Sequence, residues 1–238
     1  MFFLSSTWAG PSFPTPIDPP KKSKLYTSAQ TAPFKDCSNK KLYKDVFSCF
    51  TNGGEANHAF MLLQRNAKGT PLKTKYVALL HHGLSDSPYF YRDIAIAIYK
   101  LGYNVIAPRW SGMGSKAEDL YFTHRKEWYQ DVKFSKELAL RYGKKIIYGG
   151  MSLGGALIVK ESILNPDPNV AGAMFFSPAI GLEPRIRKAC LPIIQALYGA
   201  KKTYGKDVRY SKISHSGTCE LTRVIDDLLE EKFDTNYK

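Results

Sequence analysis

An α/β fold built on a doubly wound, mostly parallel sheet is predicted by three observations on the 238-residue sequence. Short apolar runs of the kind found in buried parallel strands recur along the chain. Segments with apolar residues at helical spacing separate these runs, so strands and helices alternate between residues 76 and 176. The connecting segments are long enough for right-handed crossovers, which place helices on the faces of the sheet.

The first half of the chain supplies three of the expected strands. Residues 1–41 contain many prolines and no sustained periodicity, and we expect an extended N-terminal arm there. Residues 58–64 form a candidate strand that leads, through a Lys-Gly-Thr-Pro turn and as a hairpin, into the apolar strand 76–80. The alternating Ile and Ala of residues 91–100 predict a helix, and residues 104–107 predict the next strand.

The second half continues the alternation up to residue 176. A helix with one apolar face is expected from Trp128 to Tyr142. Residues 145–148 are typical of a buried strand, residues 153–164 of a helix that ends at an Asn-Pro pair, and residues 170–176 of a further strand. These elements complete the predicted sheet.

Beyond residue 180 the character of the chain changes, because no strand-like apolar run appears again. Residues 181–198 and 220–233 have helical composition, and a basic loop separates them. We therefore expect three parts: the arm over 1–41, an α/β core over 42–180 and a helical cap segment over 181–238.

Composition limits the classes of partner. Lys and Arg number 34 against 21 Asp and Glu, which gives a formal charge of +13. The basic residues are scattered and no run resembles a nucleic-acid-binding arm, so we expect a basic solvated surface and no nucleic-acid partner. No apolar stretch reaches the ~20 residues of a membrane span. Contact with an anionic membrane surface and the oligomeric state stay open.

The four cysteines are Cys37, Cys49, Cys190 and Cys219, two near each end of the chain. This distribution suits two local disulfides in an oxidising compartment, and it suits four reduced thiols equally well. The opening MFFLSSTWAG lacks the basic start of a secretion signal. A cytoplasmic and a periplasmic or secreted location therefore both stay open. No metal-ligand spacing is present, and we expect neither a metal nor a cofactor.

The stretch from Lys144 to Leu164 passes from strand to tight turn to helix, with a serine at the tip. Gly150, Ser152 and Gly154 fit the pattern G-x-S-x-G. A nucleophile on a sharp strand-to-helix turn crowds its neighbours, so the flanking positions must lack side chains. The alternative is a Gly-rich turn with an incidental serine. Its place between a parallel strand and a helix favours Ser152 as a nucleophile.

A second informative turn follows strand 76–80 and reads His81-His82-Gly83-Leu84. In acyl transfer, backbone N–H groups aimed at the attacked carbonyl oxygen stabilise the transition state by about 3 to 4 kcal/mol per donor. We expect the N–H groups of Leu84 and Leu153 to form such an oxyanion hole. Neither histidine is assigned a role in proton transfer.

Together, these features resemble the α/β-hydrolase superfamily. The segments HGLSDSPYFYRDIA, APRWSGMGSKAEDL, EWYQDV and GGMSLGGAL are similar to bacterial carboxylesterases related to monoacylglycerol lipases. The similarity runs from Tyr76 to Leu182 and continues more faintly to residues 219–221. The resemblance implies that Ser152 is the nucleophile, that Leu84 and Leu153 supply the oxyanion-hole amides, and that the substrate is a small acyl ester.

Two departures from the family pattern stand out. Met113 replaces the histidine of the usual S-G-H-G loop. In the superfamily an acid and a histidine follow the serine on later strands, but the sole histidine after Ser152 is His215, in the predicted cap loop. Asp207 precedes His215 by too few residues for a strand and its crossover. We therefore expect the chain to end before the strands that carry the triad acid and histidine.

Three functional hypotheses follow from this pattern. The first is a serine carboxylester hydrolase with an acyl-enzyme mechanism, or the N-terminal part of one, with little or no turnover in this form. The second is a non-catalytic binding or regulatory protein that keeps the scaffold and has lost the triad. A thioesterase or acyltransferase is not distinguished from an esterase by fold and turn alone. The last strand, residues 170–176, is expected to be an apolar sheet edge prone to association.

Overall fold

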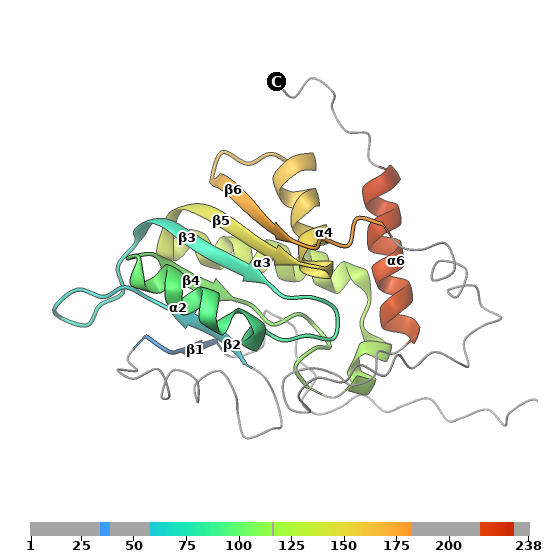
Figure 1. The fold of residues 1–238 in the computed structure, drawn as a ribbon, viewed down its shortest axis with the longest axis horizontal. Coiled ribbons are helices and arrows are strands. Elements are labelled where there is room, and N and C mark those ends of the chain that lie inside the picture. The colour runs from blue at the N-terminus through green and yellow to red at the C-terminus, as the bar shows by residue number, and fades with distance from the viewer. Residues whose placement is uncertain (1–33, 39–57, 116, 182–214, 231–238) are drawn as a thin grey trace, which may run out of the picture.

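A computed structural model describes residues 34–38, 58–115, 117–181 and 215–230 of the chain, and all statements below concern these residues. They form one six-stranded sheet in the order β1-β2-β4-β3-β5-β6, with helices on both faces (Figure 1). The strands are β1 (Phe34–Asp36), β2 (Ala59–Leu62), β3 (Thr74–His81), β4 (Asn104–Ala107), β5 (Gly143–Met151) and β6 (Val170–Phe176).

The sheet is parallel at every pairing except one. β3 pairs in parallel with β4 and β5, β5 with β6, and β1 with β2, whereas β2 runs antiparallel to β4. The predicted α/β fold with a mostly parallel sheet is confirmed. The parallel strands therefore share one edge, at which β3 and β5 both end.

Strand β3 shows why a continuous apolar run builds a strand buried on both faces. Successive side chains point to opposite faces. Val77 and Leu79 pack in one cluster with Ala139 of helix α3 (Arg125–Tyr142). Ala78 and Leu80 pack in another cluster. All four are at most 4% exposed.

The helices cover the two faces unequally. One face is covered by α2 (Arg92–Lys100), and the other by α3 (Arg125–Tyr142) and α4 (Leu153–Val159) (Figure 1). His124 begins α3 with a capping box, in which its ring accepts from Lys126 and Glu127 accepts from the His124 N–H. Three shorter helical segments are also present: η1 (Pro88–Tyr91), η2 (Ala117–Phe122) and η3 (Lys160–Leu164).

The last described helix, α6 (His215–Glu230), packs against the core helices α3 and α4 and against η2. Its apolar side, including Val224 and Ile225, joins the large cluster under α4. Polar contacts also hold it: Asp227 accepts hydrogen bonds from Arg125 Nε (2.9 Å) and Tyr129 Oη (2.7 Å). This ion pair and burial keep α6 on the body of the fold.

Two local predictions are wrong. The turn around Gly69 exists, with an antiparallel bridge between Arg65 and Pro71, but β2 and β3 do not form the expected hairpin. β4 lies between them, because the longer crossover through α2 returns to that position. The helix expected from Glu220 begins at His215, so His215 opens a helix and does not lie in a loop.

Several other expectations fall partly outside the description. The helix predicted over 181–198, Asp207, Cys49 and Cys190 lie outside the described residues. β1 belongs to the predicted arm and pairs with β2. The three-part division at residues 41 and 180 therefore stays a prediction. Both described cysteines, Cys37 and Cys219, are disulfide-bonded.

Candidate active site at the end of strand β5

Ser152 stands at the turn from β5 into α4, as the G-x-S-x-G pattern predicts. β5 ends at Met151 and α4 begins at Leu153, so one residue makes the whole turn. Its backbone has φ 50° and ψ −116°, in the region of positive φ that a residue with a Cβ rarely adopts. Such strain is typical of residues that a surrounding structure holds in place at a functional site.

The glycines of the turn are required by close approach. A Cβ on Gly150 would lie 2.8 Å from the carbonyl oxygen of Gly154. A Cβ on Gly154 would lie 2.6 Å from the carbonyl carbon of His81 and 2.7 Å from the His82 oxygen. These distances are shorter than real Cβ contacts allow, so the lack of a side chain at Gly150 lets β5 meet α4, and the lack of one at Gly154 lets α4 reach the end of β3.

Hydrogen bonds fix the backbone of Ser152 on both sides. Its N–H donates to the Phe176 oxygen of β6 (3.1 Å), and its oxygen accepts from the N–H groups of Ala156 (3.0 Å) and Ala179 (2.9 Å). The serine is thus tied to the helix that follows it and to the end of the neighbouring strand. Its side chain is free of these bonds and partly exposed.

The turn after β3 lies directly against the serine. The position of a Cβ on Gly83 would be 3.2 Å from the Ser152 Cβ. Leu84 follows in this turn and is 7% exposed, and Leu153 is buried as the first residue of α4. The first N–H groups of a helix have no partner within it. The structure therefore brings Ser152, Leu153 and the Gly83-Leu84 turn together, and we call this place the corner. The proposed role of the Leu84 and Leu153 amides in binding an oxyanion stays a prediction.

His82 is held in one tautomer by its neighbours. Its Nε2 accepts from the Trp110 N–H (3.2 Å), so its Nδ1 carries the proton that it donates to the Gly83 oxygen (2.9 Å). The Trp110 indole N–H in turn donates to the His82 oxygen (2.8 Å). With both ring nitrogens engaged, His82 shapes the turn and is not placed to take a proton from Ser152.

His81 is a second buried histidine, and its ring is hydrogen-bonded to Ser135 of α3. The hydroxyl of Ser135 donates to the Val132 oxygen (2.9 Å), so it accepts from the Nε2–H of His81 (3.3 Å). Burial lowers the pKa of His81 to about 3, and the charge of His82 adds to this. Burial likewise lowers the pKa of His82 to about 3, although its bond to Gly83 works in the opposite direction. Both rings are neutral near pH 7.

The other histidines lie elsewhere. His58 precedes β2, three strand positions from β5, which corresponds to about 14 Å at the usual spacing. His124 caps α3, and the side chain of His215, at the start of α6, is outside the description. Among the histidine rings that the structure describes, none hydrogen-bonds to Ser152. A proton acceptor for Ser152 is therefore not identified there.

Asp86, to which no role was assigned from the sequence, also lies at this corner. One carboxylate oxygen of Asp86 would lie 2.7 Å from a Cβ on Gly83, so Gly83 is flanked by Asp86 and Ser152. Asp86 is 5% exposed. Burial, and then the charge of Asp86, raise the pKa of Tyr91. The available signal was an acidic residue four positions after His82. Sequence spacing does not give the orientation of its side chain.

The loop over residues 109–115 is fixed by α3. Asp131 accepts from the Ser111 N–H (2.7 Å), and the Trp128 indole N–H donates to the Ser111 oxygen (3.1 Å). Met113, which replaces the histidine of the family pattern, is fully buried in the cluster with Trp110 and Leu153. The loop over residues 109–115 therefore packs against Leu153 and supports the corner.

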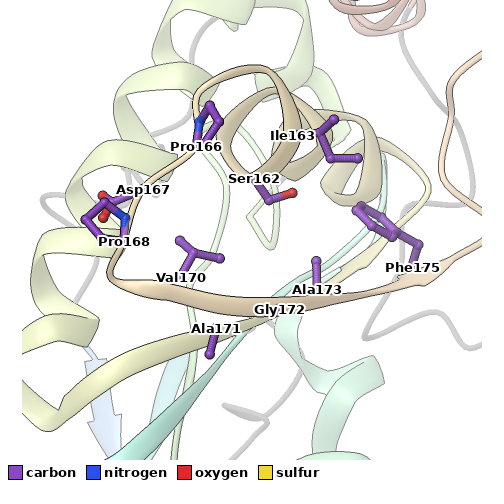
Figure 2. A pocket seen from close by; sticks show the side chains of 10 residues that line it. All are labelled: Ser162, Ile163, Pro166, Asp167, Pro168, Val170, Ala171, Gly172, Ala173 and Phe175. Atoms are coloured by element: carbon purple, nitrogen blue, oxygen red, sulfur yellow. The ribbon is translucent and has the colours of Figure 1, made fainter. Parts of the chain in front are cut away.

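A separate hollow of about 460 Å³ lies between η3 and β6 and does not include Ser152. Figure 2 shows Ala173 and Phe175 pointing into it from the strand and Ala171 pointing away. It is lined by Ser162, Ile163, Pro166, Asp167, Pro168, Val170, Ala171, Gly172, Ala173 and Phe175. This hollow is part of the exposed side of the edge strand and does not belong to the corner.

Within the described ranges, no group of three or more His, Cys, Asp or Glu side chains is arranged to hold a metal ion. The described helices include none that is long and apolar enough to cross a membrane.

The fold is that of an α/β hydrolase, with Ser152 at the turn from β5 into α4. The model of the serine aminopeptidase family S33 matches residues 73–230, which is more than half of the chain. The chain therefore belongs to this hydrolase family.

A thermostable monoacylglycerol lipase of Bacillus sp. (strain H-257) is 33% identical over 89 residues, which cover 37% of this chain and 36% of that lipase. The matched part thus spans about a third of that relative. A solved structure from the work on LipS and LipT, two metagenome-derived lipolytic enzymes, has a TM-score of 0.59 at 21% identity, covering 75% of this chain and 71% of that one. A soluble variant of the monoglyceride lipase of Saccharomyces cerevisiae has a TM-score of 0.51 at 14% identity, covering 71% and 65%. At these sequence identities the two solved structures show that the fold is similar and nothing more.

Proposed function

We propose that the protein is a serine carboxylester hydrolase, or the N-terminal part of one, that acts on small acyl esters through an acyl-enzyme. The observation that carries the proposal is the contact between the His82-Gly83-Leu84 turn and Ser152. The similarity to a monoacylglycerol lipase favours an ester as the substrate.

In the proposed reaction the Ser152 hydroxyl attacks the ester carbonyl, and the N–H groups of Leu84 and Leu153 bind the oxyanion that forms. Collapse of this intermediate releases the alcohol and leaves an acyl group on Ser152. Water then attacks the acyl group and frees the acid. Each step needs a base that accepts and returns one proton.

This base is not among the histidines described at the corner, and turnover by the 238-residue chain is expected to be small. His82 is engaged at both nitrogens and His81 is buried. The same observation favours a second candidate, a binding or regulatory protein that keeps the scaffold and lacks the triad.

Covalent labelling by a fluorophosphonate separates these two candidates. If the hydrolase proposal is right, the wild-type chain and Ser162→Ala, whose hydroxyl donates to the Ile158 oxygen away from the corner, are expected to acquire one label, and slowly, because no base for Ser152 is identified among the described histidines. Ser152→Ala is expected to acquire none. Intact mass and peptide mapping measure the label, and hydrolysis of a nitrophenyl ester measures turnover.

Labelling that persists in Ser152→Ala would remove Ser152 as the nucleophile. A wild-type chain that stays unlabelled, while an ester analogue still raises its melting temperature, would support the binding protein instead.

A further inference from the structure

Basic side chains gather at the end of the sheet opposite the corner, where β3 and β5 begin. Three segments that are distant in the sequence meet there, residues 64–76, 98–104 and 138–146, and none of them contains Asp or Glu. Their exposed cations, which together we call the basic end, are Lys68, Lys73, Lys75, Lys100, Arg141, Lys144 and Lys145. The loop before β6 also reaches this end, and its one acid, Asp167, is bound by Lys136 (2.7 Å). Figure 1 shows the loop between β2 and β3 projecting from this end.

Asn104 holds the three segments together. Its side-chain amide group donates to the carbonyl oxygens of Leu72 and Tyr142, both at 2.6 Å. Its Oδ1 accepts a hydrogen bond from the Gln64 N–H (2.6 Å). Asn104 itself is fully buried. The loops that carry the cations are therefore parts of one ordered surface.

Two of the lysines are direct neighbours in the sheet. Thr74 of β3 pairs with Gly143 of β5. The residues that follow them, Lys75 and Lys144, therefore lie side by side on adjacent strands. Like charges at such positions destabilise a sheet. An anionic surface placed against the basic end would relieve this repulsion.

Two leucines are exposed among the cations. Leu101, next to Lys100, is 73% exposed, and Leu72, next to Lys73, is 43% exposed. Among the large apolar side chains that the structure describes, Leu101 is the most exposed. Exposed leucines flanked by lysines suit a membrane interface, because the apolar groups enter the acyl boundary while the ammonium groups stay among the headgroups. The phosphates of a nucleic acid would use the cations alone.

We propose that the basic end docks on a membrane surface that contains anionic phospholipids. The cations contact the headgroup phosphates, and Leu72 and Leu101 enter the interface. β3 runs over eight residues from this end to the corner, which corresponds to about 26 Å at the usual rise of a strand. Ser152 then faces away from the membrane. The proposal goes beyond the proposed function and does not depend on Ser152 as a nucleophile.

Flotation with large unilamellar vesicles tests the proposal. One set of vesicles contains phosphatidylcholine alone, and the other contains phosphatidylglycerol as about a third of the lipid, which supplies the negative surface charge. We expect the chain to float with the anionic vesicles in about 0.1 M NaCl and to be released in about 1 M NaCl, because the Debye length falls from about 10 Å to about 3 Å. Vesicles of phosphatidylcholine alone should retain little protein.

The double variant Lys75→Gln, Lys144→Gln should bind anionic vesicles about 25-fold more weakly, since each lysine near such a surface contributes about fivefold. The control, Lys126→Gln with Lys133→Gln, removes the same charge from exposed positions of α3. These positions lie about 14 Å or more before the end of α3, beyond the Debye length, so binding should change by no more than about twofold.

Leu101→Ala separates lipid from nucleic acid. It should weaken binding to anionic vesicles by about three- to tenfold, through lost apolar burial, and leave binding to a short DNA duplex unchanged. If the duplex binds more tightly than the vesicles and Leu101→Ala weakens neither, the basic end is a nucleic-acid surface and the proposal is wrong.

Two further outcomes would overturn the proposal. Equal losses in the two lysine pairs would show only the general attraction of a chain with a formal charge of +13. Absence of flotation with anionic vesicles in about 0.1 M NaCl would remove lipid binding altogether. Each of these outcomes leaves the proposed function of Ser152 standing.

Discussion

The corner around Ser152 and the edge strand β6 are hydrogen-bonded neighbours, yet they are packed in opposite ways. On the corner side, Tyr148, Leu153 and the end of β3 are fully buried. On β6, three large apolar side chains, Met174, Phe175 and Phe176, are 36–37% exposed. The boundary between tight and open packing runs along the pairing of β5 with β6.

The same contrast appears in the glycines. Gly154, at the corner, has no room for a Cβ, whereas a Cβ on Gly172 of β6 would meet no atom within 4 Å. The tightest packing is thus found where α4 meets β3, next to Ser152. Gly172 has room for a Cβ, and we still expect the exposed apolar edge at β6 to be prone to pairing with another chain.

The largest expected effect is that of a methyl group at the corner. Gly154→Ala places a Cβ against the backbone of His81 and His82, which cannot move without displacing β3. We expect a loss of about 3 kcal/mol or more in the free energy of unfolding, the upper range for overpacking a core. Urea unfolding followed by circular dichroism measures it.

Gly172→Ala is the matched control in β6. It should change the free energy of unfolding by no more than about 0.5 kcal/mol, as surface substitutions usually do. Equal losses in the two variants would show that the corner and the edge do not differ in packing.

A smaller difference is expected for shortened side chains on the paired strands. Ile146 of β5 is fully buried, so Ile146→Ala should cost about 2–5 kcal/mol through lost burial and the cavity left behind. Met174→Ala on β6 should cost about 1 kcal/mol or less, because the side chain is already partly solvated. Chemical denaturation of both variants checks the ranking, and a reversed order would contradict it.

A pH dependence is expected at the corner and not at β6, since β6 carries no titratable side chain. The pKa values of His81 and His82 fall from 6.5 to about 3 on folding. Between these values the unfolded chain takes up protons that the folded chain does not. The free energy of unfolding should therefore decrease as the pH falls below 6.5, by up to about 1.4 kcal/mol per pH unit for each ring.

The variant His81→Phe isolates one of the two contributions. It should reduce the slope between pH 6.5 and 5 by about the share of one ring, as measured by urea midpoints at several pH values. A wild-type slope near zero, or one that His81→Phe leaves unchanged, would contradict the neutral buried state of these histidines.

Much of the fold was predictable because apolar runs and helical spacing are local signals. The run at residues 104–107 is strand β4 without adjustment, and residues 170–176 are β6. The order of strands in space was not readable in this way. The hairpin between β2 and β3 was expected from a good turn, but turn chemistry does not decide which strand takes the neighbouring place.

The residues of the candidate site likewise fall into those found from local sequence signals and those found only from the structure. Ser152, Gly150 and Gly154 were found from their spacing, because a strand-to-helix turn needs them within a few residues of one another. Asp86 was missed, since its meaning depends on its approach to a residue 66 positions later in the chain. The fixed tautomers of His81 and His82 likewise depend on Ser135 and Trp110, which belong to other elements.

The sequence by itself determined which segments become strands and helices and which residue stands at the turn after β5, because these follow from neighbours along the chain. Only the tertiary structure decided that β4 lies between β2 and β3, and that the Asp86 carboxylate lies beside the turn that meets Ser152. Those outcomes come from packing between distant segments, where burial and backbone contact select one arrangement among many that the local pattern allows.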